Sequence, residues 1–568
     1  MFLKPYFLAS AVLAALCSMS FGDTSAFTIV DDAALNSAVA QTRTEFMAQR
    51  TETQPNFTRL DCTLLIPNPD GTWRRGSFNP TAIAYPASTV KLCFLASAMN
   101  WCGTNGQPYT ALDADVFPMI KDSDNIATGR VVDSVTGAPN IPGMRKTTDP
   151  AWQPWLNARL YTENFLTARG LLENANYFNK TYPSNSGPGL VGAESLGFNN
   201  QGSNRMQPKC SASLMLELAK GAIQPGATSY VLDVLKHNRW DGNTITGAGY
   251  PAGTIYCNKG GWTSTSNNDV AYVRLPNGKE FILSVFSNAY DGTQPYPYDQ
   301  SILSVFAEML MERLGLEAGG PAKVKVDDGG AGYSTTGAWT SSTTAKEKYG
   351  ATYAFASGGT GNATATFNLN APTTGKYEIC VRYPQGTNRA ADAPFTVNHA
   401  GGSKTIAVNQ QLTGGRWVRL GDFQLNAGSG SVVLSNAVSN QSSIVVADAV
   451  RAQLWPAGSP ANKVLHIDNI TMSNGSVVSD RAYYFAKALV TVKDAAGALV
   501  QGANVRCTWT GIASDFQSAT TRANGVAEFQ GPYSSKQGTS TFNTQEIIMD
   551  GGDYNAAANV ITSKSIGI

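Results

Sequence analysis

A serine and a lysine three residues apart, Ser88 and Lys91, are the sharpest chemical feature of the 568-residue sequence. They follow Pro86, which disfavours helix before it, and they open the apolar run 92–99. We therefore expect Ser88 at the start of a buried helix, with Lys91 on the same face. A hydroxyl becomes a good nucleophile when a base removes its proton, and a desolvated lysine amine can be that base. The ordinary alternative is a serine cap beside a surface lysine.

Two further polar motifs follow along the chain. Ser123-Asp124-Asn125 precedes a helical run over residues 126–135, where the ordinary alternative is a capping turn. Lys259-Gly260-Gly261 ends a predicted edge strand that is followed by a hairpin, and its alternative is a strand end with a bulge. Each motif alone is a weak indication of function. The three motifs become informative through their order along the chain.

Ser-x-x-Lys, then Ser-Asp-Asn, then Lys-x-Gly is the signature order of penicillin-recognising serine enzymes. On these residues, the region from about 30 to 316 resembles the class A β-lactamase and D,D-peptidase superfamily. Neighbouring residues agree, because Ile126-Ala127-Thr128 follows the second motif and Pro251-Ala252-Gly253-Thr254 precedes the third. The resemblance implies an α/β (α+β) domain with an antiparallel sheet and packed helices.

The resemblance also implies a role for each motif residue. Ser88 would be the acylated nucleophile, and Lys91 its base or part of a proton relay. Ser123 would pass the proton to the leaving nitrogen. Asn125 would hold the amide side chain of the substrate, and Lys259 would attract the substrate carboxylate. The oxyanion hole would be formed by the backbone N–H groups of Ser88 and of Trp262, which follows Gly261.

Two departures from the family pattern matter. Gly260 stands where the family usually has Thr or Ser, whose hydroxyl helps to bind the carboxylate. Thr263, Ser264 or Thr265 is the candidate substitute, and an esterase becomes an alternative. The short distance between Ser88 and Ser123 in sequence implies a compact helical subdomain.

A class A β-lactamase also needs a Glu that activates water for deacylation, in a loop between the second and third motifs. Glu194 is the best candidate, and it precedes a predicted helix over residues 211–220. The family's following Asn matches loosely, since Asn199 is five residues on instead of four. The alternative is a solvent-exposed loop Glu. Glu163 and Glu173 are weaker candidates, because each fits a helical segment.

The hydrophobic periodicity of residues 24–317 predicts the helices and strands that must position these residues. Leu35, Val39, Thr42 and Phe46 fall on one helical face and predict an opening helix. Strand patterns cover 61–66 and the segment up to Phe78, and later 254–259, 269–275 and 280–287, with a hairpin turn at 276–278. An amphipathic pattern over 301–314 predicts a closing helix. The order of elements predicts an antiparallel sheet covered by helices.

Composition excludes several classes of function. With 42 basic and 41 acidic residues, the chain is no strongly basic nucleic-acid binder. The eight cysteines form no CxxC pair, and the three histidines lie far apart, so we expect no metal centre and no cofactor. These histidines are His237, His399 and His466.

Residues 1–22 have the pattern of a signal peptide that is cleaved near Gly22, with Lys4 before a short apolar stretch. The alternative is an uncleaved anchor, for which the stretch is short. No later stretch is expected to span a membrane, so we expect a secreted or periplasmic bacterial protein. Seven cysteines then remain, and an odd number leaves at least one thiol outside any internal disulfide.

Residues 323–456 lose helical periodicity and show short strand runs, which is typical of a β-sandwich. The runs include 376–383, 416–425 and 444–454. The region resembles the golvesin C-terminal-like, or Xly carbohydrate-binding-like, sandwich. The residues that carry this resemblance are 327–339, Gly375-Lys376-Tyr377-Glu378, 388–394, His399-Ala400-Gly401-Gly402 and 446–451.

The golvesin-like resemblance implies a module that binds glycans. Four aromatic residues either stack on sugar rings or fill the sandwich core, and we favour the core. They are Tyr333, Trp339, Tyr349 and Trp417. After a break at 457–460, residues 463–568 resemble a bacterial immunoglobulin-like sandwich, on the turn at Gly497 within 494–509 and on 524–529. Such modules act as spacers or adhesive units, and the sequence identifies no site in this one.

The sequence thus predicts three domains behind the leader: 24–317, 323–456 and 463–568. The first hypothesis is an exported serine hydrolase that acts on β-lactams or on cell-wall peptides. D,D-carboxypeptidase and esterase activities are alternatives on the same fold. The alternative of another class is a surface glycan-binding or adhesive protein with an inert first domain, whose C-terminal modules would bind glycans or peptidoglycan.

Overall fold

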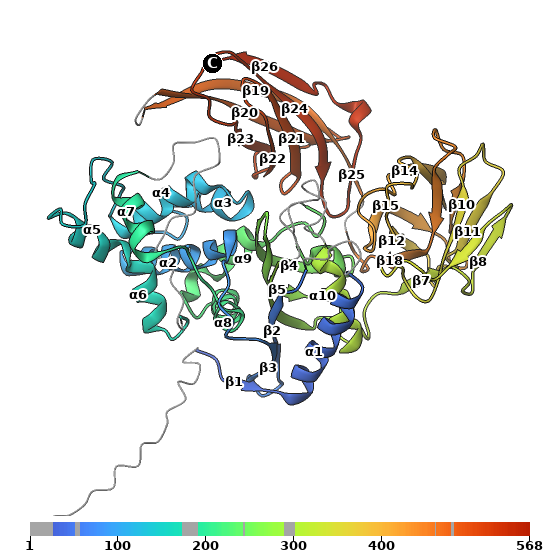
Figure 1. Cartoon of the computed structure of the whole chain (residues 1–568), viewed down its shortest axis with the longest axis horizontal. Coiled ribbons are helices and arrows are strands. Elements are labelled where there is room, and N and C mark those ends of the chain that lie inside the picture. Colours follow the sequence, from blue (N-terminus) through green and yellow to red (C-terminus); the bar gives the residue numbers. More distant parts are fainter. Residues whose placement is uncertain are drawn as a thin grey trace, which may run out of the picture.

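The computed structural model describes residues 26–50, 57–172, 191–241, 245–288, 302–459, 462–478 and 482–568. The predicted signal peptide at 1–22 lies outside the described residues. Figure 1 shows helices beside a central sheet, and two separate groups of strands formed by the rest of the chain. The protein is therefore multidomain, with an α/β region followed by two all-β regions.

The central sheet positions the third motif on its edge. Its strand order is β1-β3-β2-β6-β5-β4, and β4 is the edge strand. All neighbouring pairs are antiparallel except β1 and β3. The strands are β1 (Ile29–Asp31), β2 (Leu60–Pro67), β3 (Trp73–Phe78), β4 (Ile255–Thr263), β5 (Ser266–Arg274) and β6 (Glu280–Ser287).

Each face of the central sheet has its own apolar core. Helices α1 (Ala33–Ala48) and α10 (Leu303–Arg313) pack on one face. The four residues predicted to form the inner face of α1 are all buried, which confirms the opening helix. Helix α8 (Pro208–Ala219) packs on the other face and belongs to the core of the helical subdomain.

The helical subdomain holds the first two motifs. Ser88 lies in a 3-10 turn, Ala87–Val90, that continues directly into α2. The second motif lies between α3 and α4, as expected. The helices are α2 (Lys91–Thr104), α3 (Asp113–Lys121), α4 (Asn125–Thr136), α5 (Trp152–Arg159), α6 (Tyr161–Ala168), α7 (Gly192–Gln201) and α9 (Thr228–Leu235).

The first β-region is a sandwich whose sheets have the orders β15-β12-β18-β7, β14-β13-β16-β11-β8 and β17-β10-β9. One expectation fails here: the run 444–454 is two strands in different sheets, broken at Asp448. The strands are β7 (Lys323–Asp327), β8 (Tyr333–Thr336), β9 (Thr340–Ser342), β10 (Tyr353–Ser357), β11 (Thr364–Asn368), β12 (Gly375–Arg382), β13 (Ala393–His399), β14 (Gly402–Val408), β15 (Val418–Leu425), β16 (Ser431–Ser435), β17 (Ile444–Ala447) and β18 (Ala449–Leu454).

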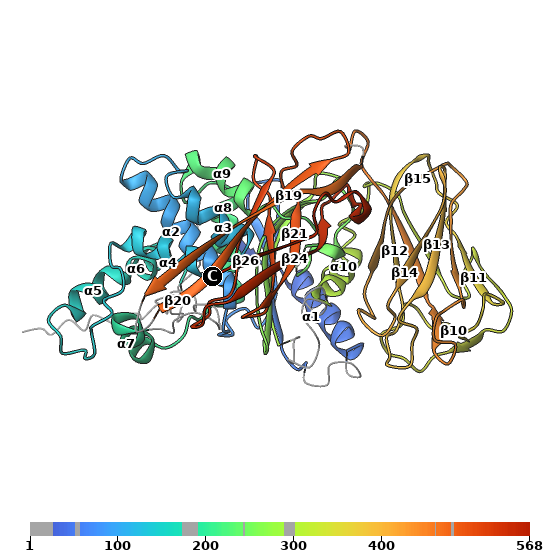
Figure 2. The same ribbon diagram turned by 90° about the horizontal axis from the view of Figure 1, so that it is seen from above.

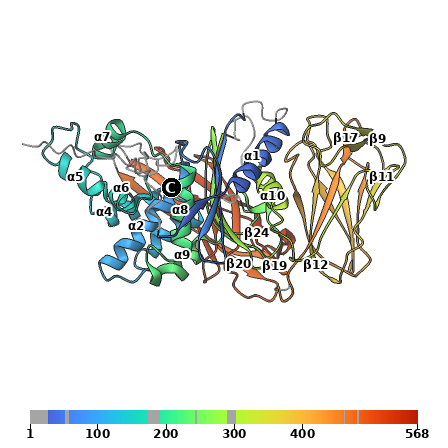
Figure 3. The same ribbon diagram turned by 90° about the horizontal axis from the view of Figure 1, so that it is seen from below.

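The second β-region has two four-stranded sheets, of orders β23-β20-β19-β25 and β22-β21-β24-β26. Figure 2, seen from above, shows its strands in front of α3, α4 and the central sheet, and Figure 3, seen from below, shows the same strands behind the α/β region. The strands are β19 (Lys463–Val478), β20 (Ala482–Asp494), β21 (Asn504–Gly511), β22 (Asp515–Thr520), β23 (Val526–Gln530), β24 (Thr539–Ile548), β25 (Gly552–Tyr554) and β26 (Ser563–Gly567).

One buried ion cluster joins all three regions. Arg239, in the segment between α9 and β4, is fully buried, and its guanidinium lies 2.6 Å from Glu378 and 3.2 Å from Asp550. Glu378 belongs to β12 of the first sandwich and Asp550 to the second, so one side chain of the α/β region binds both. The indole of Trp240 also donates to Glu378, at 2.8 Å.

Two further buried ion pairs join the α/β region to the first sandwich. Glu308 of α10 lies 3.2 Å from Arg451 and accepts a hydrogen bond of 2.6 Å from the indole of Trp417. Arg50 lies 3.0 Å from Glu347 and donates to the carbonyl of Gly415. These groups are buried, so the two regions are docked through charged groups as well as apolar contacts.

The cysteines of the described residues form no disulfide. All seven that remain after the predicted leader are buried free thiols. Among the described helices, none is long and apolar enough to cross a membrane. With no disulfide among the described cysteines, packing, hydrogen bonds and ion pairs hold the regions together.

We predict that Glu378→Gln lowers the free energy of unfolding by about 3–5 kcal/mol, because it leaves Arg239 buried with one fewer counter-charge. Chemical unfolding followed by tryptophan fluorescence measures this loss. Arg130→Ala, which removes an exposed pair with Asp115, is the matched control and should cost at most ~1 kcal/mol. Equal effects of the two changes would show that the buried cluster does not hold the regions together.

Candidate active site

The side-chain nitrogen of Lys91 contacts residues of both the first and the second motif. Its Nζ lies 3.0 Å from Ser88 Oγ, 3.1 Å from Ser123 Oγ and 2.8 Å from Asn125 Oδ1. The carbonyl of Ser123 accepts a fourth contact at 2.5 Å. The structure therefore places three of the predicted residues around the side-chain nitrogen of a fourth, Lys91.

Lys91 is held in a state that favours a neutral amine. It is fully buried, and burial lowers its pKa well below the ordinary value. The nearby positive charge of Lys259 lowers it further, whereas Asp124 acts in the opposite direction. A neutral amine 3.0 Å from a serine hydroxyl is placed to take its proton.

Ala87, which precedes Ser88, and Ser123 have strained backbone conformations. Ala87 has φ +48° and Ser123 has φ +57°, values that side-chain-bearing residues adopt rarely. Asp124 then caps α4 by accepting the amide of Ala127 at 2.7 Å. The capping interpretation of the second motif is thus correct for Asp124, while Ser123 and Asn125 turn towards Lys91.

Lys259 lies on β4 and is fully buried. Burial lowers its pKa to about 8, against the attraction of Asp269, Asp241 and Asp122. Asp269 on β5 is buried too, and it accepts hydrogen bonds from Thr246, Tyr256 and Asn258. This carboxylate network behind β4 was not predicted, since no motif in the sequence marks it.

Gly261 explains why the edge strand can approach the nucleophile. A Cβ atom at this position would lie 2.7 Å from the amide nitrogen of Ser88 and 2.6 Å from that of Thr89. Only glycine therefore lets β4 pack against the turn that carries Ser88. Trp262 follows on the same strand and is 37% exposed.

The third motif lies inside β4 instead of ending it, which corrects the predicted strand end, because β4 continues to Thr263. Of the hydroxyl groups proposed to replace the missing one at Gly260, that of Thr263 lies at the end of β4, and those of Ser264 and Thr265 lie in the turn between β4 and β5. Thr263 Oγ1 lies 2.8 Å from Ser266 Oγ and accepts the amide of Thr265. These interactions occupy Thr263 within the turn.

The structure does not bring Glu194 to this cluster. Glu194 lies in the first turn of α7, not in a loop, and forms an ion pair with Arg159, which also binds Asp133. The four partners of Lys91 Nζ include no carboxylate. Glu163 lies in α6, and burial raises its pKa, while Glu173 lies outside the described residues.

The second sandwich contacts the segment that carries Ser123, and sequence reasoning missed this contact. The amide of Thr520, at the end of β22, donates to Asp122 at 2.8 Å. Nearby, Arg522 pairs with Asp113 at 2.8 Å and lies over the ring of Phe117. The region expected to be a spacer is thus docked directly beside the candidate site.

The favoured core interpretation is confirmed for Tyr333 and Trp339, whereas Trp417 and Tyr349 lie at the interface with the α/β region. Trp417 is 4% exposed and faces Glu308 of α10. Tyr349 packs on Trp417 with ring centres 5.5 Å apart, and Tyr333 packs on Phe367 at 5.0 Å. Trp339 is partly buried against the sandwich core.

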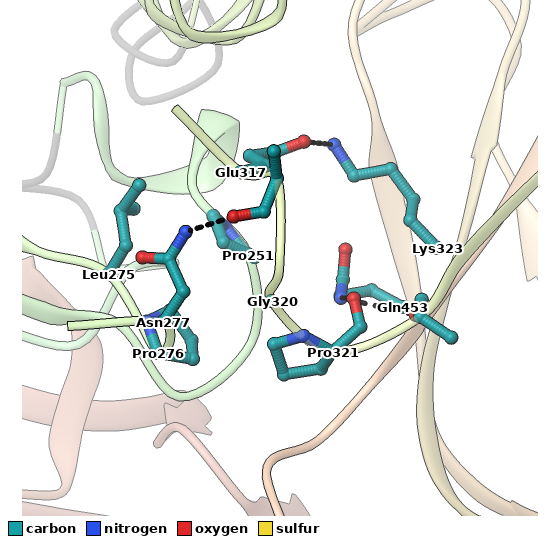
Figure 4. A pocket seen from close by; sticks show the side chains of 11 residues that line it. Pro251, Leu275, Pro276, Asn277, Glu317, Gly320, Pro321, Lys323 and Gln453 are labelled. Atoms are coloured by element: carbon teal, nitrogen blue, oxygen red, sulfur yellow. Dashed lines mark hydrogen bonds and ion pairs between the residues drawn. The ribbon is translucent and has the colours of Figure 1, made fainter. Parts of the chain in front are cut away.

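A pocket of about 350 Å³ lies elsewhere, between the α/β region and the first sandwich. Figure 4 shows Asn277, Glu317, Lys323 and Gln453 around it, with Glu317 and Lys323 paired. None of its lining residues belongs to the cluster around Lys91. It is a gap beside the linker and not the candidate site.

Comparison with known proteins identifies two of the regions. The profile described as Beta-lactamase enzyme family matches residues 103–314, a range that begins after Lys91, and the Golvesin C-terminal domain profile matches 324–453. Golvesin from Dictyostelium discoideum is 35% identical over 406 residues, which cover 71% of this chain and 70% of golvesin. A match of this length extends beyond residues 323–568 into the α/β region.

Other relatives match smaller shares. Xanthan lyase from Bacillus sp. (strain GL1) is 38% identical over 124 residues, 21% of this chain and 13% of the lyase. Among solved structures, the β-lactamase from Sphaerobacter thermophilus DSM 20745 is 17% identical with a TM-score of 0.35, covering 49% of this chain and 97% of its own. PBP-A is 17% identical with a TM-score of 0.35, covering 51% and 98%.

We predict that Asp122→Ala slows labelling of Ser88 by a fluorophosphonate several-fold, because the Thr520 amide loses its acceptor and the Ser123 segment loosens. Asp122→Asn keeps an acceptor oxygen and should label at nearly the original rate. Asp494→Asn, in a turn of the second sandwich, is the control for nonspecific effects. If the Ala and Asn variants label alike, this contact does not position the segment.

Proposed function

The chain belongs to the golvesin family and contains a β-lactamase-family domain, and on this basis we propose that it is an exported serine hydrolase that opens amide bonds through an acyl-serine intermediate. The observation that carries the proposal is the position of Lys91 Nζ, buried and within 3.1 Å of both Ser88 Oγ and Ser123 Oγ. A spacer or adhesive domain has no need of a buried lysine between two hydroxyl groups.

In the proposed reaction, neutral Lys91 takes the proton of Ser88 while Oγ attacks the carbonyl carbon of the substrate. The backbone N–H groups of Ser88 and Trp262 hold the resulting oxyanion. The amide C–N bond then breaks, and Ser123 passes the proton from Lys91 to the leaving nitrogen. Lys259, when charged, attracts the carboxylate of the substrate.

Deacylation distinguishes the alternatives on this fold. Fast β-lactamase turnover needs a carboxylate that activates water, whereas Arg159 holds Glu194 and Lys91 contacts no carboxylate among the described residues. We therefore favour slow deacylation, as in a D,D-carboxypeptidase acting on cell-wall peptides, with β-lactams as acylating ligands. Rapid turnover would point to the class A β-lactamase alternative.

The remaining regions have proposed roles of their own. We place the hydrolase domain at 24–317, the golvesin-like sandwich at 323–456 and the immunoglobulin-like sandwich at 463–568. Export by the predicted signal peptide would bring the site to the periplasm or outside the cell, where peptidoglycan is found. Glycan binding by the golvesin-like sandwich would use surfaces other than Trp417, which is buried against α10.

We predict that a fluorescent penicillin acylates Ser88, and that intact-protein mass and peptide mapping find one adduct per chain. Ser88→Ala and Lys91→Met should lower the acylation rate by at least about 100-fold, since nucleophile or base is removed. Ser97→Ala, a buried serine of the same helix, is the matched control and should be labelled normally. An adduct that forms equally in Ser88→Ala would refute the assignment.

The lifetime of that adduct decides between the alternatives. A long-lived adduct in the unmodified protein supports slow deacylation, and Glu194→Gln should then leave its lifetime unchanged. Rapid loss of the adduct that becomes slow in Glu194→Gln would establish Glu194 as the water-activating residue. Faster turnover of a short nitrophenyl ester than of a chromogenic cephalosporin would favour the esterase alternative.

We predict that the acylation rate by a carboxylate-bearing β-lactam falls as pH rises through about 8, because Lys259 loses its positive charge there. Below this pH the charge is present, and the depressed pKa of Lys91 keeps its amine available as a base. Lys259→Arg keeps the charge to higher pH and should move the decline upwards. A decline that stays near pH 8 in Lys259→Arg would assign it to another group.

A further inference from the structure

Three aspartates converge in the first sandwich, far along the chain from the serine site. Asp327, Asp328 and Asp448 each offer a carboxylate oxygen, and these oxygens all lie within 4.8 Å of one another. Asp327 ends β7, Asp328 follows it, and Asp448 is the residue at which the expected strand 444–454 breaks into β17 and β18. The break thus has a chemical consequence, because it turns a carboxylate towards the end of β7.

Asp328 and Asp448 are buried, whereas Asp327 is partly exposed. Asp448 is 1% exposed and Asp328 is 6% exposed. Asp328 Oδ1 is buried and has no hydrogen-bond partner among the described residues, while its Oδ2 accepts from Thr352 at 3.0 Å. A buried anionic oxygen without a partner is costly, and a bound cation is one way to satisfy it.

The backbone around the cluster is shaped to hold it. The amide of Tyr349 donates to both oxygens of Asp448, at 3.2 and 3.0 Å, and the amide of Asp328 donates to the carbonyl of Asp448 at 2.8 Å. Gly350 has φ +59°, and a Cβ atom there would lie 2.0 Å from Asp327 Oδ2. Glycine is therefore required for the loop 345–352 to close over the carboxylates.

The negative charge of the cluster is not balanced by the protein. Within the described residues, no Lys, Arg or His nitrogen lies within 4.0 Å of any of the three carboxylates. Arg382 acts on Asp327 and Asp448 from a greater distance. Each carboxylate would be stabilised by a cation at the centre of the cluster.

We propose that Asp327, Asp328 and Asp448 bind a Ca²⁺ ion that fastens β7, the β17–β18 junction and the loop 345–352 to one another. The ligand atoms are oxygens alone, which hard cations prefer over the sulfur and nitrogen ligands of zinc sites. Two oxygens that bind the same Ca²⁺ lie at most about 5.2 Å apart. The oxygens of the cluster lie within this limit, since all are within 4.8 Å of one another. Water and backbone carbonyls would complete the six to eight ligands that Ca²⁺ takes.

The bound ion would also support the docking of the sandwich on the α/β region. The loop 345–352 carries Glu347, which pairs with buried Arg50 at 3.0 Å. It also carries Tyr349, which packs on Trp417 beside α10. Ca²⁺ would therefore stabilise the interface between the two regions, with no part in the chemistry at Ser88.

The test uses the full-length chain after treatment with a chelator and removal of the chelator. Tb³⁺, a luminescent substitute for Ca²⁺, should bind one ion per chain and be excited through Tyr349 and Trp417, and CaCl₂ should displace it. CaCl₂ alone should raise the melting temperature by about 3 °C or more at saturation, and MgCl₂ by less.

Variants locate the site. Asp448→Asn should weaken Tb³⁺ and Ca²⁺ binding at least about tenfold, since a charged ligand is lost. Asp327→Asn, at the more exposed edge of the cluster, should do the same if Asp448→Asn fails to fold. Asp392→Asn, which changes a carboxylate on a loop of the same sandwich, is the control and should bind normally.

Two results would overturn the proposal: no saturable Tb³⁺ or Ca²⁺ binding by the unmodified chain, or binding that is unchanged in both Asp327→Asn and Asp448→Asn. The labelling rate of Ser88 is measured in parallel. It should be the same in Asp327→Asn as in the unmodified chain at moderate temperature, which separates the cation site from the proposed hydrolase activity.

Discussion

The burial of Arg239 is the constraint on which the arrangement of the three regions depends. A guanidinium removed from water is stable only when anions replace the water, and here the anions come from two other regions, Glu378 and Asp550. Separation of either sandwich from the α/β region would remove one of the counter-charges of Arg239. Because Arg239 lies in the segment that leads into β4, the docked sandwiches also fix the edge strand that carries Lys259.

Lys91 is a second buried basic residue, but its surroundings favour the neutral form of its side chain. Among the described residues no carboxylate contacts it, and its four partners are uncharged oxygens. Burial therefore favours loss of its proton, whereas the ion pairs of Arg239 keep that residue charged. Arg239 thus has a structural role, whereas Lys91 can act as a base. The difference lies in the groups that contact the side-chain nitrogens of the two residues.

Sequence patterns predicted the parts of the fold in which side-chain periodicity decides the structure. The inner face of α1 and the bounds of β6 agree with the prediction, because alternating or helical burial is visible in the residue types. The break at Asp448 was missed, since apolar residues continue on both sides of it and only the tertiary structure turns the chain there. Glu194 was placed by spacing alone, and spacing carries no information about Arg159, which the fold brings to it.

The residues that carried the golvesin-like resemblance have structural tasks in this chain. Glu378 holds Arg239, Arg451 holds Glu308, and Asp448 belongs to the carboxylate cluster. In this chain Glu378 and Arg451 dock the sandwich on the α/β region, and their presence does not by itself identify a sugar-binding surface. Trp417 supports this view, because its indole donates to Glu308 across the interface. A glycan-binding surface on this module would have to be formed by residues other than these buried ones.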